Sequence, residues 1–428
     1  MFMPLLLLKG LFTGFAAGTV ASFGVLTVAP SMAQLDSLQR AQTSLNQTLS
    51  GAGVGALGGL IWAAAEKRRQ RRLPWKGKRP FVVRRKHPES QEITSFELQP
   101  VDGGPVPCHE AGQFLTLELQ IPGQVKPIIR TYSLSDFPES NEPLDHYRIS
   151  VKREPAPKGL DVPPGLASNF LHDHVEEGTT IHIRPPAGSF VLSEDGNDPI
   201  VLVSNGVGIT PMLAMVKAAV SKWPQRPIWF VHGCRNSKNH AFKADIMELA
   251  RKHPNLHVHV AYSRPLNEDE GSYQSQGYVD GALLQQLISA PASYYLCGSP
   301  AFMDSLVMTL QSAGVESTEI RFERFSQAAQ AAKPTAVTPV SSCEVEFSRS
   351  GLRAIWNAGD PEQSLLELAE ANGLEPPSAC RAGVCGTCTT RVRSGSVGYL
   401  TDPSAEVAPG SALICIARPA STTLDLDQ

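Results

Sequence analysis

The 428-residue sequence has few cysteines, and it lacks the regular cysteine spacing of a disulfide framework. The number and spacing of the eight cysteines therefore disfavour a disulfide-stabilised fold. The chain also lacks the polar excess of a disordered protein, because 42% of it is hydrophobic and only 18% is charged. Its length is sufficient for two or three globular domains, each with its own core.

Charged side chains are also absent near the N-terminus, from Gly10 to Pro30. A run of about twenty apolar residues is long enough to span a bilayer as a helix, so we expect a membrane segment here. The alternative is a cleavable signal peptide, because Ser31, Met32 and Ala33 follow the apolar run at a position where cleavage would occur.

A second uncharged stretch, Gly51 to Ala65, is either a second span or a flexible tether. Five of the six residues 67–72 are basic, and such runs stay on the cytoplasmic side of a membrane. Beside an apolar segment this pattern disfavours a nucleic-acid partner. We therefore expect a membrane anchor of one or two helices over 1–65 and a basic linker over 66–74. The expected location is a bacterial-type inner membrane, with the catalytic body in the cytoplasm.

Residues 75–195 contain short β-rich runs separated by Gly and Pro turns, which is typical of a small antiparallel β-barrel. Two motifs within this region carry residue types that suit a flavin. An Arg can neutralise a phosphate, a flat Tyr can pack on the ring, and a Ser hydroxyl can lie near the ring nitrogen. The start of an expected helix that runs to His174 offers backbone N–H groups to a second phosphate. The candidate residues are Arg130, Thr131, Tyr132 and Ser133 in the first motif, and Gly165, Leu166, Ala167 and Ser168 in the second.

Residues 196–325 predict a doubly wound α/β domain. The apolar run 199–203 has the length of a buried parallel strand, and further strands are expected at 228–232, 257–262 and 294–297. After the first strand, glycines let the backbone approach a pyrophosphate at the start of a helix expected from Met212, with Thr210 as its cap. The glycine spacing alone would fit an ordinary tight turn equally well. The candidate residues are Gly206, Gly208, Ile209, Thr210 and Pro211.

The C-terminal region, 342–428, follows a linker at 326–341 that is poor in large apolar residues. It carries four cysteines in the C-x4-C-x2-C…C spacing of a plant-type 2Fe-2S site. A zinc site or a thioredoxin-like pair are the alternatives, but a zinc ribbon needs two CxxC pairs and only one is present. The expected iron ligands are Cys380, Cys385, Cys388 and Cys415.

Two resemblances extend this interpretation. Residues 342–428 resemble plant-type ferredoxins, which implies a β-grasp-like α+β fold. Trp75 to Phe325 resembles the reductase half of flavohaemoglobins, within the ferredoxin reductase superfamily. The shared phrases are RTYSLSD from Arg130, YRISVKRE from Tyr147, SNFLHDHV from Ser168 and PPAGSF from Pro185. The resemblance does not include the globin, so nitric oxide dioxygenation by this chain does not follow from it.

The second resemblance implies that FAD is the flavin, held by Arg130, Tyr132 and Ser133 with Lys152 nearby. It also implies that Cys297 and Gly298 flank the nicotinamide and that Glu323 to Phe325 close over the flavin. Ser133, Cys297 and Glu323 are the expected catalytic residues. The sequence departs from the frequent family pattern at Phe114 and Ser189, where Tyr and Asp are common.

Together these features predict a membrane-anchored NAD(P)H-dependent reductase. Hydride would pass to FAD, and single electrons would pass through the 2Fe-2S cluster to an external protein acceptor such as an oxygenase or a haem or metal redox protein. NADH is favoured, although Arg235 could meet the 2′-phosphate of NADPH. The alternatives are a non-catalytic, membrane-tethered redox sensor and a chain that runs in reverse to form NADH.

Overall fold

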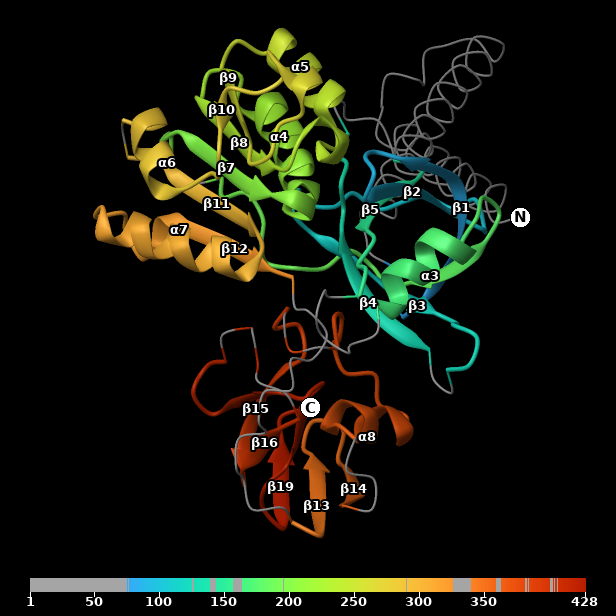
Figure 1. The fold of residues 1–428 in the computed structure, drawn as a ribbon. Helices are drawn as coiled ribbons and strands as arrows, with labels where there is room; N and C mark the ends of the chain where they lie inside the picture. The colour runs from blue at the N-terminus through green and yellow to red at the C-terminus, as the bar shows by residue number, and fades with distance from the viewer. Residues whose placement is uncertain are drawn as a thin grey trace, which may run out of the picture. The chain divides into compact units, whose positions relative to one another are not determined.

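The structure is a computed structural model of the chain. It describes residues 75, 77–124, 127–138, 144–156, 164–194, 196–289, 291–325, 340–358, 363–381, 383, 385–400, 403, 405 and 407–428. The expected membrane segments, the basic run 67–72 and the linker residues 326–339 lie outside this set. Within it, no helix has both the length and the apolar character needed to cross a membrane. The unit that begins at Trp75 contains three larger sheets (Figure 1).

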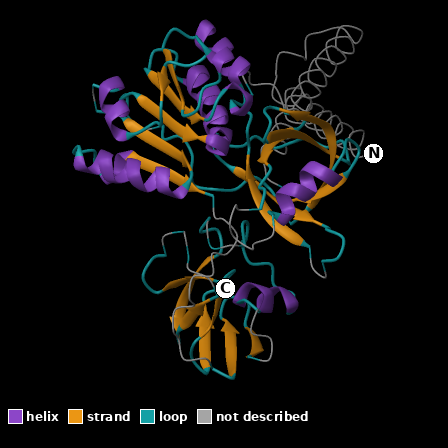
Figure 2. Ribbon diagram, viewed as in Figure 1, coloured by secondary structure: helices purple, strands orange, loops and turns teal. Residues whose placement is uncertain are grey.

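The first sheet is the expected antiparallel barrel (Figures 1 and 2). Its strand order is β4-β3-β6-β1-β2-β5, and an isolated bridge between Leu134 and Ile149 joins the two edges, so that the sheet closes. Alternate side chains such as Phe81 and Val83 fill its interior, and Leu171 of helix α3 joins the same core. The elements are β1 (Arg79–Pro88), β2 (Ile93–Pro100), β3 (Phe114–Leu119), β4 (Ile128–Ser133), β5 (Tyr147–Lys152), α3 (Leu166–His174) and β6 (Thr180–Ile183).

The second sheet is parallel, with strand order β10-β9-β8-β7-β11-β12. Successive residues of β7 pack on opposite faces: Leu202 contacts the core beneath α4 and α5, and Val203 contacts the core beneath α6 and α7. Because helices cover both faces, the strand is apolar throughout, which explains the continuous run in the sequence. The elements are β7 (Ile200–Asn205), α4 (Ile209–Lys222), β8 (Ile228–Cys234), α5 (Lys243–Lys252), β9 (Leu256–Tyr262), β10 (Ser275–Gln276), α6 (Gly281–Leu287), β11 (Ser293–Gly298), α7 (Pro300–Ser312) and β12 (Ile320–Arg324).

The third sheet is mixed, with order β14-β13-β19-β15-β17, and its neighbouring strands β13 and β19 are parallel. One helix, α8, packs on its core through Leu365 and Leu368, which is the expected β-grasp-like arrangement. Ser364 caps this helix in a capping box with Glu367, so the sequence determines where the helix begins. The elements are β13 (Ser342–Phe347), β14 (Leu352–Asn357), α8 (Leu365–Ala371), β15 (Thr389–Ser394), β16 (Val397–Tyr399), β17 (Ser411–Leu413), β18 (Ala417–Pro419) and β19 (Thr423–Leu426).

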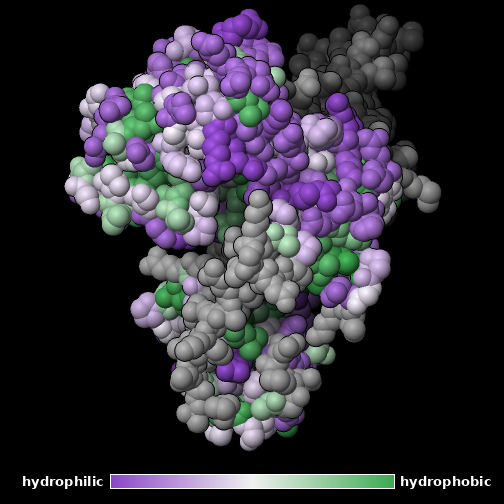
Figure 3. All heavy atoms as spheres, viewed as in Figure 1, coloured by the Kyte–Doolittle hydropathy of each residue, from purple (hydrophilic) through white to green (hydrophobic). Residues whose placement is uncertain are grey.

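The apolar side chains of these sheets are largely internal. On the face shown in Figure 3, hydrophilic residues cover most of the coloured surface, and hydrophobic residues form small separate patches. Scattered apolar residues of this kind are normal on a folded surface.

Candidate functional site

The parallel sheet has a topological switch point between β7 and β11, because the chain builds outward from β7 through β8 and β9 and then returns to β11 on the other side. Ligands of such sheets bind at the carboxyl ends of the strands beside this point. β7 ends at Asn205 and β11 ends at Gly298. The side chain of Asn205 joins the two ends, since its Oδ1 accepts a hydrogen bond of 2.9 Å from the backbone N–H of Ser299.

The predicted glycine turn lies at this edge. Gly206 has a φ of +52°, which favours glycine, and no heavy atom lies within 4 Å of the position a Cβ would take, so its outer face is open. Gly208 is required for a different reason: a Cβ there would lie 2.1 Å from the carbonyl oxygen of Cys297. The turn thus offers a bare backbone beside β11, which fits the close approach of a pyrophosphate.

The helix after this turn differs from the expectation in two details. It begins at Ile209, not at Met212, because the 3₁₀ turn Gly206–Gly208 runs directly into it. Thr210 does not cap the helix; it lies inside the first turn, where its hydroxyl donates to the carbonyl oxygen of Val207 at 3.0 Å. Pro211 occupies the first turn, where its missing N–H costs no intrahelical bond.

The three expected catalytic residues lie together. Cys297 of β11 and Glu323 of β12 are paired in register on adjacent strands. Ser133, at the end of barrel strand β4, donates its hydroxyl to Glu323 Oε2 at 3.3 Å. The structure therefore brings one barrel residue and two residues of the parallel sheet to one place, although 190 positions separate Ser133 from Glu323.

Burial controls the ionisation of this group. It raises the pKa of Glu323 to about 8, and the hydrogen bond from Ser133 opposes that shift. Burial and the neighbouring Glu323 also raise the pKa of the Cys297 thiol well above its ordinary value. At neutral pH both side chains therefore keep their protons, so Cys297 is a neutral, space-filling neighbour and Glu323 is a proton donor.

Gly298 and Phe325 lie next to this group in the chain, each directly after or at the end of one of the two strands. A Cβ on Gly298 would lie 2.2 Å from Asn205 Oδ1, so only glycine leaves the amide bridge intact. Phe325 follows β12 and packs, partly buried, against the core that contains Cys297.

The candidate flavin residues of β4 differ in exposure along the strand. Arg130 is exposed, and its guanidinium donates to the carbonyl of Ile129 at 2.8 Å through Nη1. Thr131 and Tyr132 are half-buried, and burial raises the pKa of the Tyr132 phenol, so its ring stays neutral. An exposed cation beside a neutral flat ring fits a phosphate and an isoalloxazine ring, respectively.

The second flavin motif lies at the start of α3, where Gly165 is the N-cap and makes no side-chain capping bond. The Ser168 hydroxyl donates to the carbonyl of Gly165 at 3.1 Å, and Leu166 is exposed while Ala167 is buried in the barrel core. Lys152 forms an ion pair of 3.0 Å with Glu154. Its charge is thus already compensated, which weakens it as a phosphate ligand.

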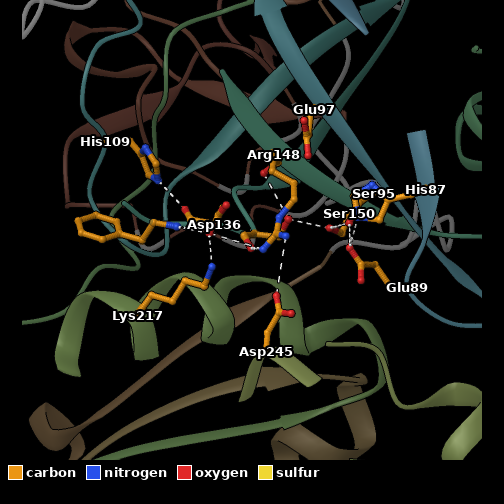
Figure 4. A network of polar contacts seen from close by, with 12 residues as sticks. His87, Glu89, Ser95, Glu97, His109, Asp136, Arg148, Ser150, Lys217 and Asp245 are labelled. Carbon is orange, nitrogen blue, oxygen red and sulfur yellow. Dashed lines mark hydrogen bonds and ion pairs between the residues drawn. The ribbon is translucent and has the colours of Figure 1, made fainter. Parts of the chain in front are cut away.

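A polar network between the barrel and the parallel sheet was not identified from the sequence (Figure 4). Lys217 of α4 donates to Asp136 Oδ1 at 2.7 Å, and Arg148 of β5 lies 3.6 Å from Asp136 and 4.0 Å from Asp245 of α5. These cations hold the pKa of Asp136 below its usual value against the opposing effect of burial. The signal in the sequence was Lys217, a charged residue within the otherwise apolar run 211–220 of α4. The network fixes α4 to the strand end that carries Ser133.

The four expected iron ligands converge in the third sheet region. Three lie on the loop between α8 and β15, and Cys415 lies between β17 and β18. The backbone N–H of Cys385 donates to Cys380 Sγ at 3.4 Å, and Cys415 hydrogen-bonds to the thiols of Cys380 and Cys388. Gly383 and Gly386 have φ near +70°, which lets the loop fold tightly around the sulfurs. Four convergent thiols with an amide aimed at one of them fit a 2Fe-2S cluster.

The fold and these sites define a class: a reductase with a flavin barrel, a pyridine-nucleotide domain and a 2Fe-2S domain on one chain. Comparisons with known proteins agree. Residues 202–307 match the family described as oxidoreductase NAD-binding domain, and residues 350–420 match the 2Fe-2S iron-sulfur cluster binding domain.

Among curated relatives, a flavohemoprotein of Bacillus cereus (strain ATCC 10987 / NRS 248) is 41% identical over 258 residues, which are 60% of this chain and 62% of the relative. A flavohemoprotein of Burkholderia sp. (strain TH2) is 43% identical over 256 residues. This chain thus spans about three fifths of the length of these relatives.

Two solved structures show which parts of the chain are similar to known folds. The flavohem-like FAD/NAD-binding domain of nitric oxide dioxygenase from Vibrio cholerae O1 biovar El Tor is 36% identical, with a TM-score of 0.51, over 58% of this chain and 99% of that one. Phthalate dioxygenase reductase, described as a modular structure for electron transfer from pyridine nucleotides to 2Fe-2S, is 26% identical, with a TM-score of 0.54, over 82% of this chain and 98% of that one.

The chain belongs to the flavohem-like FAD/NAD-binding reductase family and carries, in addition, a C-terminal 2Fe-2S domain. It is accordingly an NAD(P)H oxidoreductase whose cofactors are FAD and a 2Fe-2S cluster.

Proposed function

We propose that this chain is an electron-transfer reductase that takes hydride from NAD(P)H and delivers single electrons to a separate acceptor protein. The observation that carries the proposal is the convergence of Ser133, Cys297 and Glu323 beside the switch point of the parallel sheet. This arrangement supports a role for Glu323 as a proton-holding carboxyl at the point where a barrel-bound flavin and a sheet-bound nicotinamide would meet. FAD, when bound, supplies the conversion of one hydride into two single electrons.

Residues of the parallel sheet bind the coenzyme in this proposal, and residues of the barrel bind the flavin. Gly206 and Gly208 to Pro211 would bind the pyrophosphate of the coenzyme, and Gly298, at the end of β11, would lie beside the nicotinamide. Arg130 would hold a flavin phosphate and Tyr132 would pack on the ring. Within this proposal, the flavin module is 75–195, the nucleotide module is 196–325, the linker is 326–341 and the 2Fe-2S module is 342–428.

Glu323 manages the proton that accompanies hydride transfer. With a pKa of about 8, its carboxyl is protonated at neutral pH, and the Ser133 hydroxyl keeps Oε2 in place through the 3.3 Å hydrogen bond. Were FAD bound as proposed, the carboxyl of Glu323 would hold a proton beside the flavin ring, and its partial exposure would let solvent replace that proton. Cys297, which remains a neutral thiol, closes the inner wall against water.

The acceptor is a protein that accepts one electron at a time. Similarity to phthalate dioxygenase reductase supports an oxygenase, and a haem or metal redox protein would use the same electron. The test is anaerobic addition of NADH to the purified chain. The proposal expects the flavin absorbance to bleach and, when cytochrome c is added as a one-electron acceptor, the cytochrome to become reduced; a chain whose flavin stays oxidised would refute it.

We also propose that residues 1–65 anchor the chain in a bacterial-type inner membrane, with the reductase in the cytoplasm. Moving the five basic residues of 67–72 through hydrocarbon would cost about 2.5–3.5 kcal/mol for each charge, which keeps them on the cytoplasmic side. A reporter that works only in the cytoplasm, fused after Gln428, should be active, and the chain should sediment with membranes. A periplasmic C-terminus or a fully soluble full-length chain would contradict this placement.

A further inference from the structure

In doubly wound folds, the residues just after the second strand of the βαβ unit determine whether NADH or NADPH binds better. An acidic side chain there accepts a hydrogen bond from the ribose 2′-hydroxyl of NADH, whereas an arginine accommodates the 2′-phosphate of NADPH. In this chain the second strand is β8, and the residues that follow it are Arg235, Asn236, Ser237 and Lys238. This segment contains an arginine and no acidic residue. Taken alone, it would favour NADPH.

The structure places a carboxylate at this position from another module. Glu92, in the turn between barrel strands β1 and β2, forms a hydrogen-bonded ion pair with the guanidinium of Arg235. The neighbouring residue Gln91 donates its backbone N–H to the carbonyl of Lys238 at 2.9 Å, so the barrel turn is fixed against the segment after β8. The two residues of the ion pair are 143 positions apart in the sequence, so the folded chain is needed to bring them together.

The segment after β8 is itself held in one conformation. Asp269 Oδ2 accepts hydrogen bonds from the backbone N–H groups of Ser237 at 3.2 Å and of Leu266 at 2.9 Å. The carbonyl of Arg235 accepts a bond of 2.9 Å from the N–H of Arg264. Arg235 therefore cannot move its backbone away from Glu92 at low cost. Both side chains still face solvent, with exposures of 50% and 32%, so a nucleotide can reach them.

We propose that Glu92 is a specificity-determining residue that makes the enzyme selective for NADH. Its carboxylate accepts the guanidinium hydrogen bond of Arg235 that a 2′-phosphate would otherwise accept, and its negative charge repels that phosphate. The same carboxylate accepts a hydrogen bond from a ribose 2′-hydroxyl. The acidic residue that similar folds carry after the second strand is thus supplied by the flavin barrel. This inference rests on the proposed use of the parallel sheet as the coenzyme site.

The test is the full-length variant Glu92→Gln, which keeps the shape of the side chain and removes its charge. Binding of 2′,5′-ADP and of 5′-AMP is measured by calorimetry, and kcat/KM for NADPH and NADH is measured with ferricyanide. We expect 2′,5′-ADP to bind about tenfold more tightly to the variant, which corresponds to one additional charge-assisted hydrogen bond, with 5′-AMP changed by less than about twofold. The ratio of kcat/KM for NADPH to that for NADH should rise by a similar factor.

Three further variants isolate the cause. The double variant Glu92→Gln, Arg235→Gln should lose the whole gain, because the gain depends on the released guanidinium. Glu248→Gln, which removes the same charge from an α5 surface pair with Lys252, should leave both affinities unchanged. Should Glu92→Gln fail to fold, Glu92→Asp, whose carboxylate is one methylene further from Arg235, should show a smaller gain in the same direction.

The inference is overturned if 2′,5′-ADP binds the Glu92 variants no more tightly than the parent chain, or if the parent chain prefers NADPH. Its failure is distinct from failure of the proposed function. Nucleotide affinities that shift as expected in a chain whose flavin is not reduced by either coenzyme would refute the function and support the role of Glu92. Efficient reduction of the flavin by NADH, without any shift in nucleotide affinity, would support the function and refute the role of Glu92.

Discussion

We expect Glu323 to make flavin reduction sensitive to pH between about 7 and 9. Its pKa of about 8 means that about nine tenths of the molecules carry the proton at pH 7 and about one tenth at pH 9. Since the protonated carboxyl is the donor, the rate constant for flavin reduction by NADH should fall by nearly tenfold between these two values. Rapid mixing of the oxidised enzyme with NADH, followed by flavin absorbance, measures this constant without the later steps.

Two variants test whether Glu323 is the group that titrates. Glu323→Gln should be slow at every pH and should lose the decline. Ser133→Ala removes the hydrogen bond that opposes the shift, so it should move the decline to higher pH. A decline that persists unchanged in Glu323→Gln would refute the assignment of the proton to Glu323.

The same shift has a consequence for stability. The pKa of Glu323 is higher in the folded chain than its ordinary value of 4.5, so the folded state binds more protons than the unfolded state between those two values. The contribution of Glu323 to the free energy of unfolding is therefore fully present below about pH 4.5 and declines as the pH rises to about 8. Denaturant unfolding of the parent chain and Glu323→Gln at several pH values should show this difference.

Three other substitutions separate the modules. Cys385→Ser should abolish electron transfer to cytochrome c while flavin reduction by NADH continues, because the cluster ligands lie in a different sheet; equal loss of both activities would mean that the sites depend on each other. Arg130→Ala removes a charge-assisted phosphate contact of about 1.5–3 kcal/mol, so flavin affinity measured by equilibrium dialysis should fall about tenfold to hundredfold, and unchanged affinity would remove Arg130 from the site. Gly208→Ala forces a Cβ to within 2.1 Å of the Cys297 carbonyl, so unfolding in urea should show a loss of about 1–3 kcal/mol together with weaker 5′-AMP binding. A Gly208→Ala chain as stable as the parent would show that β11 can move.

The sequence was sufficient where local pattern determines structure. The uninterrupted apolar run at β7 reflects burial on both faces, and the spacing of Cys380, Cys385 and Cys388 reflects one tight loop. The sequence predicts the start of α4 three residues late. The 3₁₀ turn before the helix leaves no apolar periodicity that would mark Ile209 as the first helical residue. The capping role assigned to Thr210 failed for the same reason.

Contacts between distant residues were beyond the reach of such patterns. The Lys217–Asp136 pair spans 81 positions and the Arg235–Glu92 pair spans 143, and no spacing rule connects them. Each depends on how the barrel and the parallel sheet meet, which is decided by packing of the whole unit. The convergence of Ser133 with Glu323 was anticipated only through resemblance to a family, not through the chemistry of either residue by itself.

The central claim is that hydride from the coenzyme becomes single electrons that leave through the 2Fe-2S cluster. Anaerobic rapid mixing of the full chain with one equivalent of NADH, with parallel freeze-quenched samples for electron paramagnetic resonance, follows both cofactors in one experiment. The account predicts that flavin absorbance falls first and that the signal of a reduced 2Fe-2S cluster then rises, with no such signal in Cys385→Ser. A cluster that stays oxidised while the flavin is fully reduced would contradict it.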